Sequence, residues 1–253
     1  CDMALAGNGR FLLRIEDTDT ARARPQWEAL IYQDLAWLGL SWETPVLRQS
    51  EHLARYEQNL DVLAGLGLLF PCGCKRSDIR AALSAPQEGV SKMQVYPGTC
   101  RHRSMSDRKP GDALRLNMAR ALEMVKLQQL KFSETGENTG THTVDPDWML
   151  NHIGDAVLGR KDIETVSYVL AAVIDDAAQG ITTVVRGADL FETTHLQVLL
   201  QTLLALPTPI YHHHRLIRDS NGKRLAKRDD ARAISKYRDD GHTLQEIRRL
   251  IGL

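Results

Sequence analysis

Apolar residues recur at helical spacing in three segments of the chain. The first spans residues 25–38 and opens on a proline, which suits the first turn of a helix. The second spans residues 50–66 and opens on Ser50, which is the expected N-cap. The third spans residues 193–206 and is followed by Pro207, which lacks the N–H that a continuing helix needs. We expect a helix in each segment.

Short apolar and β-branched runs predict the strands. Residues 9–15 (GRFLLRI) follow an Asn-Gly turn signal and predict a buried strand. The runs at 168–176 (YVLAAVIDD) and 181–187 (ITTVVRG) flank a glycine and predict a strand, a turn and a second strand. Residues 132–144 are rich in Gly, Thr and Asn, which favours a loop or a hairpin. Strands that alternate with helices predict an α/β fold with a parallel sheet, interrupted by an insertion.

Composition places the chain among soluble globular proteins. Hydrophobic residues make up 43% and charged residues 25% of the 253 residues, which is ordinary for a protein with a sizeable core. No apolar stretch approaches the roughly 18 residues of a membrane span, and no secretory signal pattern is present. The net charge is zero, but residues 215–253 carry eleven Lys/Arg against six Asp/Glu. This basic end fits a phosphate-contacting surface, although a solvated helical face would give the same charge.

Three of the four cysteines gather in two short motifs, CGC and YPGTC. The four are Cys1, Cys72, Cys74 and Cys100. Cys72 and Cys74 can hold one side of a tetrahedral ion, and the Pro-Gly turn before Cys100 would return its thiol beside a second ligand. Tyr96 and His102 both qualify by spacing as the fourth ligand. The motifs predict structural Zn²⁺ in a reducing, cytoplasmic setting, whereas the alternative is three reduced cysteines without a metal.

Two clusters of charge could bind a substrate. Residues 14–19 (RIEDTD) place three acids after the predicted strand, where open α/β sheets bind ligands and a carboxylate could hold an ammonium group. The alternative is an acid cluster at a helix N-terminus. Residues 222–228 (GKRLAKR) place four cations beside a glycine, as a loop that neutralises a triphosphate would. A solvated basic loop is the alternative there.

Taken together and in this order, the motifs resemble the glutamyl-tRNA synthetase family of class I aminoacyl-tRNA synthetases. They are LLRIEDTD, the CxC with YPGTC, SYVLAAVIDDAAQGITTVVRGADL and GKRLAKR. The resemblance spans nearly the whole chain, and the third block is highly specific. More narrowly, the chain is similar to the glutamyl-queuosine tRNA(Asp) synthetases, a short form that shares the catalytic core and lacks an anticodon-binding domain. A tyrosine four residues before the last cysteine also suits the short form.

The resemblance implies a Rossmann-like parallel sheet with a zinc-bearing insertion and a small helical C-terminal region. Residues 1–71 would begin the catalytic domain, 72–147 would form the insertion, 148–206 would complete the catalytic domain, and 207–253 would hold the KMSKS-type loop and the helical region. The zinc ligands of the family fall on Cys72, Cys74, Tyr96 and Cys100.

The resemblance also implies roles for residues of the active site. Glu16 would bind the α-amino group of L-glutamate, while Tyr168 and Arg186 would shape the amino-acid pocket. Arg186 would face the side-chain carboxylate, because a guanidinium can bind a carboxylate through two parallel hydrogen bonds. Lys227 matches the second lysine of the KMSKS-type loop and would contact ATP as a catalytic residue, and Arg224 replaces the first lysine of that loop.

The activity expected from the resemblance is activation of L-glutamate by ATP with Mg²⁺, then transfer of glutamate to the queuosine base of tRNA(Asp) by a monomeric enzyme. The HIGH-type motif of the family has no counterpart upstream of residue 16, so we expect either an N-terminally incomplete catalytic domain or a polypeptide that has lost half of its ATP site. Few residues follow the 222–228 loop, so we expect no anticodon-binding domain. The alternatives are a fragment of an enzyme charging tRNA(Glu) and an inactive synthetase-like protein that binds RNA or a partner.

Overall fold

A computed structural model describes residues 1–19, 23–75, 77–79, 95–126, 128–160, 165–218 and 233–252. The chain divides into two compact units, Cys1–His52 with Leu216–Leu253 and Leu53–Arg215. Among the described helices, none combines the length and the apolar character needed to cross a membrane.

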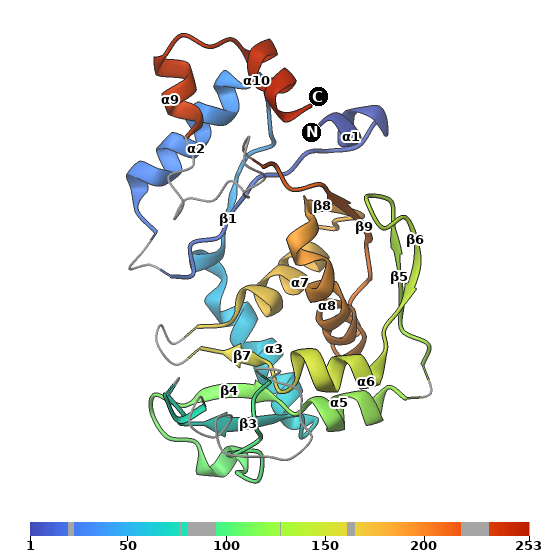
Figure 1. Ribbon diagram of the computed structural model, residues 1–253. Helices are drawn as coiled ribbons and strands as arrows, with labels where there is room; N and C mark the ends of the chain where they lie inside the picture. The colour runs from blue at the N-terminus through green and yellow to red at the C-terminus, as the bar shows by residue number, and fades with distance from the viewer. Residues whose placement is uncertain are drawn as a thin grey trace. The chain divides into compact units, whose positions relative to one another are not determined.

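The first unit is small and mostly helical (Figure 1). Its elements are α1 (Asp2–Ala6), β1 (Arg14–Ile15), α2 (Pro25–Trp37), β2 (Leu47–Arg48), the 3₁₀ turn η1 (Gln49–His52), α9 (Ile234–Asp239) and α10 (Leu244–Ile251). Strands β1 and β2 pair in parallel. An ion pair between Arg238 and Asp34, with 2.9 Å between Nη1 and Oδ1, joins α9 to α2. Thr243 caps α10 in a capping box with Glu246.

The second unit contains two sheets and the main hydrophobic core. A three-stranded antiparallel sheet has the order β3 (Leu69–Cys72), β4 (Ala113–Leu116), β7 (Val157–Gly159). A four-stranded sheet has the order β6 (Gly140–Thr143), β5 (Lys131–Glu134), β9 (Ile210–His214), β8 (Thr183–Gly187). Strand β9 pairs in parallel with both β5 and β8. These pairings give the parallel strands that an α/β fold is expected to have.

Helices of the second unit supply most of the remaining core. They are α3 (Leu53–Gly65), α5 (Met118–Met124), α6 (Pro146–Trp148), α7 (Tyr168–Ala178) and α8 (Phe191–Leu203), with the short turns η2 (Met105–Asp107), η3 (Met149–Ile153) and η4 (Ala188–Leu190). Helices α7 and α8 pack side by side (Figure 1). Buried side chains of α3, α7, α8 and β9 belong to one hydrophobic cluster, and Val184 of β8 packs against it.

Several expected elements are confirmed. Helix α2 forms within one residue and helix α8 within three residues of the expected bounds, and residues 131–143 form the β5–β6 hairpin. The expected strand over 181–187 is β8. The strand expected over residues 9–15 is present only as the two residues of β1.

Two expectations are wrong. Residues 168–176 form most of helix α7, not a strand. Seven consecutive residues, 170–176, are buried in that helix, so its hydrophobic pattern lacks the polar face that marks a helix in sequence. Ser50 lies in the 3₁₀ turn and does not cap α3; its hydroxyl donates to Asp17 Oδ2 at 2.6 Å.

Candidate functional site

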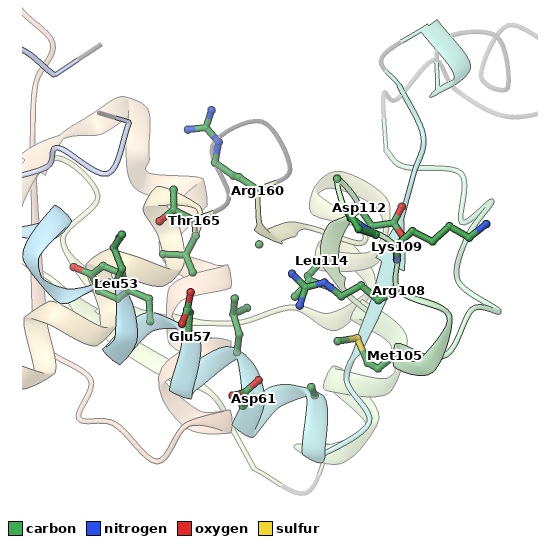
Figure 2. A pocket seen from close by; sticks show the side chains of 17 residues that line it. Leu53, Glu57, Asp61, Met105, Arg108, Lys109, Asp112, Leu114, Arg160 and Thr165 are labelled. Carbon is green, nitrogen blue, oxygen red and sulfur yellow. Dashed lines mark hydrogen bonds between the residues drawn. The ribbon is translucent and has the colours of Figure 1, made fainter. Parts of the chain in front are cut away.

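A cavity of about 580 Å³ lies in the second unit beside α3 and β4. Figure 2 shows Glu57 and Asp61 of α3 on one side of this cavity and Arg108 and Lys109 on the other. Among the described residues predicted to bind glutamate or zinc, none lines this cavity. The predicted zinc and glutamate residues that the structure describes therefore lie elsewhere in the molecule.

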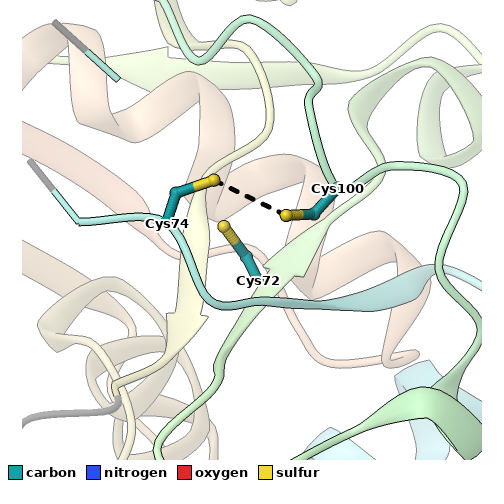
Figure 3. A group of neighbouring side chains, drawn as sticks. All are labelled: Cys72, Cys74 and Cys100. Atoms are coloured by element: carbon teal, nitrogen blue, oxygen red, sulfur yellow. Dashed lines mark hydrogen bonds between the residues drawn. The ribbon is translucent and has the colours of Figure 1, made fainter. Parts of the chain in front are cut away.

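The three thiols of the cysteine motifs meet at the end of β3 (Figure 3). The Sγ atoms of Cys72, Cys74 and Cys100 all lie within 4.8 Å of one another, and those of Cys74 and Cys100 are 3.5 Å apart. Gly98 forms the turn that returns Cys100 to the group; its φ of +83° favours glycine. None of these three cysteines forms a disulfide in the part of the chain that the structure describes.

Tyr96 completes this group, which we call the thiol cluster. Its Oη lies 3.3 Å from the Sγ of Cys72 and 3.7 Å from that of Cys74, and it accepts the backbone N–H of Cys100 at 2.9 Å. His102 is exposed, and its ring nitrogens lie outside the group of metal-ligating atoms found among the described residues. The structure thus brings three sulfurs and one phenol oxygen together, a donor set that fits tetrahedral Zn²⁺.

Two arginines lie next to the thiol cluster. The guanidinium of Arg115 lies 3.9 Å from the centre of the Tyr96 ring and donates to the backbone carbonyl of Asp155. Arg101, next to Cys100, donates from Nε to the buried carboxylate of Asp155 at 2.7 Å. Of these two arginines, Arg115 acts on the Cys72 thiol and favours its negatively charged form.

The pKa values of the Cys72 and Cys74 thiols are shifted in opposite directions. Burial raises the pKa of the Cys74 thiol to about 11 and raises the pKa of the Tyr96 phenol. Burial also acts to raise the pKa of Cys72, but hydrogen bonds with Tyr96 and Arg115 outweigh it, so that the pKa of Cys72 is lowered. A cation bound between these groups would favour the deprotonated form of Cys74, because metal binding lowers the pKa of a coordinating thiol.

The acids of residues 16–19 lie in different surroundings. The Oε1 of Glu16 is 3.2 Å from the Nη2 of Arg14, and its side chain is partly exposed just past the end of β1. Asp17 accepts the backbone N–H and the hydroxyl of Ser50. Residues 16–19 are not helical, and α2 begins only at Pro25, so these acids do not form the first turn of α2. Glu16 is the acid left near the surface.

Arg186 lies on β8 and Tyr168 is the first residue of α7. The Nε of Arg186 donates to the Nε2 of His213 at 3.0 Å, and its Nη2 donates to Thr194 Oγ1 at 2.7 Å. Tyr168 is 39% exposed. Lys227 and Arg224 lie outside the described residues. Glu16 belongs to the first unit, whereas Tyr168 and Arg186 belong to the second.

The sequence does not single out the partner of Arg186. His213 and Glu134 are buried, with 0% and 2% of their surface exposed, and the His213 Nδ1 lies 2.5 Å from Glu134 Oε2. The available signal is the alternation of β9, in which Tyr211 and His213 are buried. Within the HHH run, that alternation distinguishes the middle histidine from its two neighbours.

Comparison with known proteins identifies the family. The model of the family described as tRNA synthetases class I (E and Q), catalytic domain, matches residues 2–253. A glutamyl-Q tRNA(Asp) synthetase of Rhodobacter capsulatus is 53% identical over 256 residues, which cover 100% of this chain and 91% of the relative. Another from Nocardia farcinica is 38% identical, with 98% of this chain and 75% of the relative covered.

Solved structures show the same fold. A glutamate-tRNA synthetase from Elizabethkingia anophelis has a TM-score of 0.74 and 23% identity, with 98% of this chain and 56% of that one covered. A glutamate tRNA ligase from Elizabethkingia meningosepticum has a TM-score of 0.72 and 23% identity, with 98% and 55% covered. The chain thus spans a little over half the length of these two proteins. The class I synthetase fold predicted from the motifs is confirmed, and the chain belongs to the class I tRNA synthetase (E and Q) catalytic-domain family and, within it, to the glutamyl-Q tRNA(Asp) synthetases.

Proposed function

We propose that this protein activates L-glutamate with ATP and Mg²⁺ and transfers the glutamyl group to the queuosine base of tRNA(Asp). The observation that carries this proposal is the 53% identity, over the whole chain, to a relative named glutamyl-Q tRNA(Asp) synthetase. That likeness favours the proposal over charging of tRNA(Glu) and over an inactive RNA-binding or partner-binding protein.

Glutamate binding would involve Glu16, Tyr168 and Arg186. The carboxylate of Glu16, past the end of a parallel strand, would bind the α-amino group. Arg186 would bind the side-chain carboxylate, since among the described residues its Nη1 has no hydrogen-bond acceptor. Tyr168 would contribute to the wall of the pocket. Its 39% exposure leaves the ring accessible to a ligand.

ATP binding would fall to the basic loop. Lys227 and Arg224 would neutralise the phosphates as charge moves onto pyrophosphate, and Lys227 would act as the catalytic residue. Holding both reactants in line would account for much of the rate enhancement. The basic stretch 215–253 would hold phosphates of the tRNA backbone, which fixes register without reading sequence.

The thiol cluster would hold one structural Zn²⁺ through Cys72, Cys74, Tyr96 and Cys100. Bound zinc would crosslink the end of β3 to the Tyr96–Cys100 turn. Its role is stability of an insertion over residues 72–147, because four protein ligands leave no position for a substrate. The catalytic domain would then comprise residues 1–71 and 148–206, with the basic loop and helices in 207–253.

Amino-acid-dependent ATP–pyrophosphate exchange by the full-length protein, with and without tRNA, tests the first half-reaction. We expect exchange with glutamate and little or none with glutamine, because an amide presents an N–H₂ to the donors of Arg186. Exchange that is equal with both amino acids, or that does not depend on glutamate, would contradict the proposal. Free aspartate, which has the same charge as glutamate, is the control amino acid in the exchange assay for a nonspecific effect of a carboxylate.

A further inference from the structure

Glu134, His213 and Arg186 form a continuous polar chain inside the second unit, which we call the arginine relay. The carboxylate, the imidazole and the guanidinium come from β5, β9 and β8, three adjacent strands of one sheet. Both Glu134 and His213 are almost fully buried. Buried polar groups are retained when their hydrogen bonds are made, so the proton positions in this chain matter.

The partners assign a single tautomer to His213. Glu134 Oε1 accepts the backbone N–H of His213 at 2.9 Å and that of Gly136 at 2.6 Å. Glu134 Oε2 then accepts the Nδ1–H of His213. The Nε2 of the neutral ring carries a lone pair and accepts the Nε–H of Arg186 at 3.0 Å.

The pKa values of the pair agree with this assignment. Burial lowers the pKa of His213 and outweighs the opposing hydrogen bond from Glu134. Burial acts to raise the pKa of Glu134, but the hydrogen bonds of His213 and Gly136 outweigh it and lower that pKa. A neutral imidazole between a carboxylate and a guanidinium is the state that satisfies all three groups.

Other contacts fix the plane of the guanidinium. Arg186 Nη2 donates to Thr194 Oγ1, and the guanidinium carbon lies 5.2 Å from the centre of the Tyr211 ring. With Nε and Nη2 committed to the protein, the Nη1 end has no acceptor among the described residues. The relay thus leaves one end of the guanidinium for a ligand.

Gly136 allows the relay to close. A Cβ at this position would lie 2.2 Å from the backbone oxygen of His213, closer than any nonbonded contact. Its backbone therefore approaches β9 only because it lacks a side chain, and its N–H holds Glu134 Oε1 in place.

We propose that His213 and Glu134 are positioning residues that hold Arg186 in the orientation that binds the side-chain carboxylate of the amino-acid substrate, and that they thereby set the preference for glutamate over glutamine. This inference rests on the proposed function, in which Arg186 contacts that carboxylate. A carboxylate accepts hydrogen bonds through both oxygens, whereas the amide of glutamine offers one acceptor and one donor.

Glu134→Gln is the diagnostic variant because it keeps the shape and reverses the proton pattern. The amide oxygen would stay with the two backbone N–H groups, so the N–H₂ would face His213 Nδ1. The imidazole would then carry its proton on Nε2 and present it to the Nε–H of Arg186, leaving two donors opposed. Glu137→Gln is the matched control, since Glu137 lies on the same hairpin and is exposed.

Two measurements on the full-length protein test the relay. Calorimetry should show a glutamate Kd raised about ten- to a hundredfold in Glu134→Gln, with a smaller preference over glutamine and an unchanged Kd for ATP. Nitrogen-15 NMR of the histidine rings should show His213 protonated at Nδ1 in the wild type and at Nε2 in the variant. His213→Gln assigns the signal, and thermal unfolding checks that each variant is folded.

The outcomes separate this inference from the proposed function. A wild-type protein that fails to bind glutamate would overturn both. A wild-type His213 protonated at Nε2 would overturn the relay, as would a switched tautomer in Glu134→Gln with an unchanged glutamate Kd, while the proposed function stood. If Glu134→Gln does not fold, His213→Asn takes its place, because its amide can donate to Glu134 but lacks an acceptor at the Nε2 position. The same rise in the glutamate Kd is expected, and an unchanged Kd again counts against the relay.

Discussion

The thiol cluster and the arginine relay belong to the same unit, but they are held together in opposite ways. In the thiol cluster, three sulfurs and a phenol oxygen converge, and all of them become repelling negative charges once deprotonated. In the arginine relay, each donor meets an acceptor, from the carboxylate of Glu134 through His213 to Arg186. The first group therefore requires a cation to be stable in its ionised form, whereas the second is stable by itself and presents a donor outward.

Cys74→Ser should have the largest effect, because it removes a ligand from the thiol cluster and leaves the arginine relay intact. We expect purified wild-type protein to hold about one zinc per chain, and the variant to lose it with a destabilisation of about 4 kcal/mol or more, which is typical of losing a structural metal. Metal analysis and chemical denaturation measure both effects. Cys1→Ser is the matched control, because Cys1 lies in the other unit. Protein purified without chelators that contains no zinc would contradict the metal assignment.

Arg186→Ala is the next largest change, and it acts on the relay alone. The loss of a charge-assisted pair should weaken glutamate binding by about 2–5 kcal/mol, with the zinc content unchanged. The glutamate Kd and the metal content are measured on the same preparation, with the exposed Arg120→Ala as control. An unchanged glutamate Kd would remove Arg186 from the amino-acid pocket.

Comparing Tyr96→Phe with His102→Ala tests which of the two residues is the fourth zinc ligand of the thiol cluster. The phenol oxygen of Tyr96 contacts two thiols, while His102 is exposed outside the group. We expect Tyr96→Phe to weaken zinc binding about tenfold or more, as loss of a ligand or of its support does, and His102→Ala to leave it unchanged. Competition with a chromogenic chelator gives both affinities. The reverse order would assign the fourth ligand to His102.

Lowering the pH should produce the smallest effects. It should change zinc binding by the thiol cluster but leave glutamate binding through the arginine relay nearly unchanged. Zinc affinity should fall steadily as the pH falls from 8 to 6, since the Cys74 thiol has a pKa of about 11 without metal and must lose its proton to bind. The glutamate Kd should change little over that range, because the lowered pKa of His213 keeps the ring neutral. The pKa of His213 is lower in the folded protein than the ordinary histidine pKa of about 6.5, so below that pH the unfolded chain takes up the proton more readily. The free energy of unfolding therefore keeps the contribution of His213 above pH 6.5 and loses it as the pH falls below that value. A glutamate Kd that rises steeply between pH 8 and 7 would show that His213 titrates there.

The same contrast explains what the sequence could predict. The ligands of the thiol cluster lie in two short motifs with turn residues between them, so their spacing alone indicated a metal, though not the choice between Tyr96 and His102. The relay joins residues 134, 186 and 213, whose proximity follows from the order of strands in the sheet. Local pattern also failed for α7, since a helix buried along residues 170–176 shows no polar face.

Transfer of labelled glutamate to tRNA tests the central claim most directly. The full-length protein is incubated with ATP, Mg²⁺ and radiolabelled glutamate, together with tRNA(Asp) that contains queuosine, tRNA(Asp) that lacks it, or tRNA(Glu). We predict labelling of the queuosine-containing tRNA(Asp), with the other two tRNAs left largely unlabelled. Efficient charging of tRNA(Glu), or equal labelling of tRNA(Asp) with and without queuosine, would contradict the account.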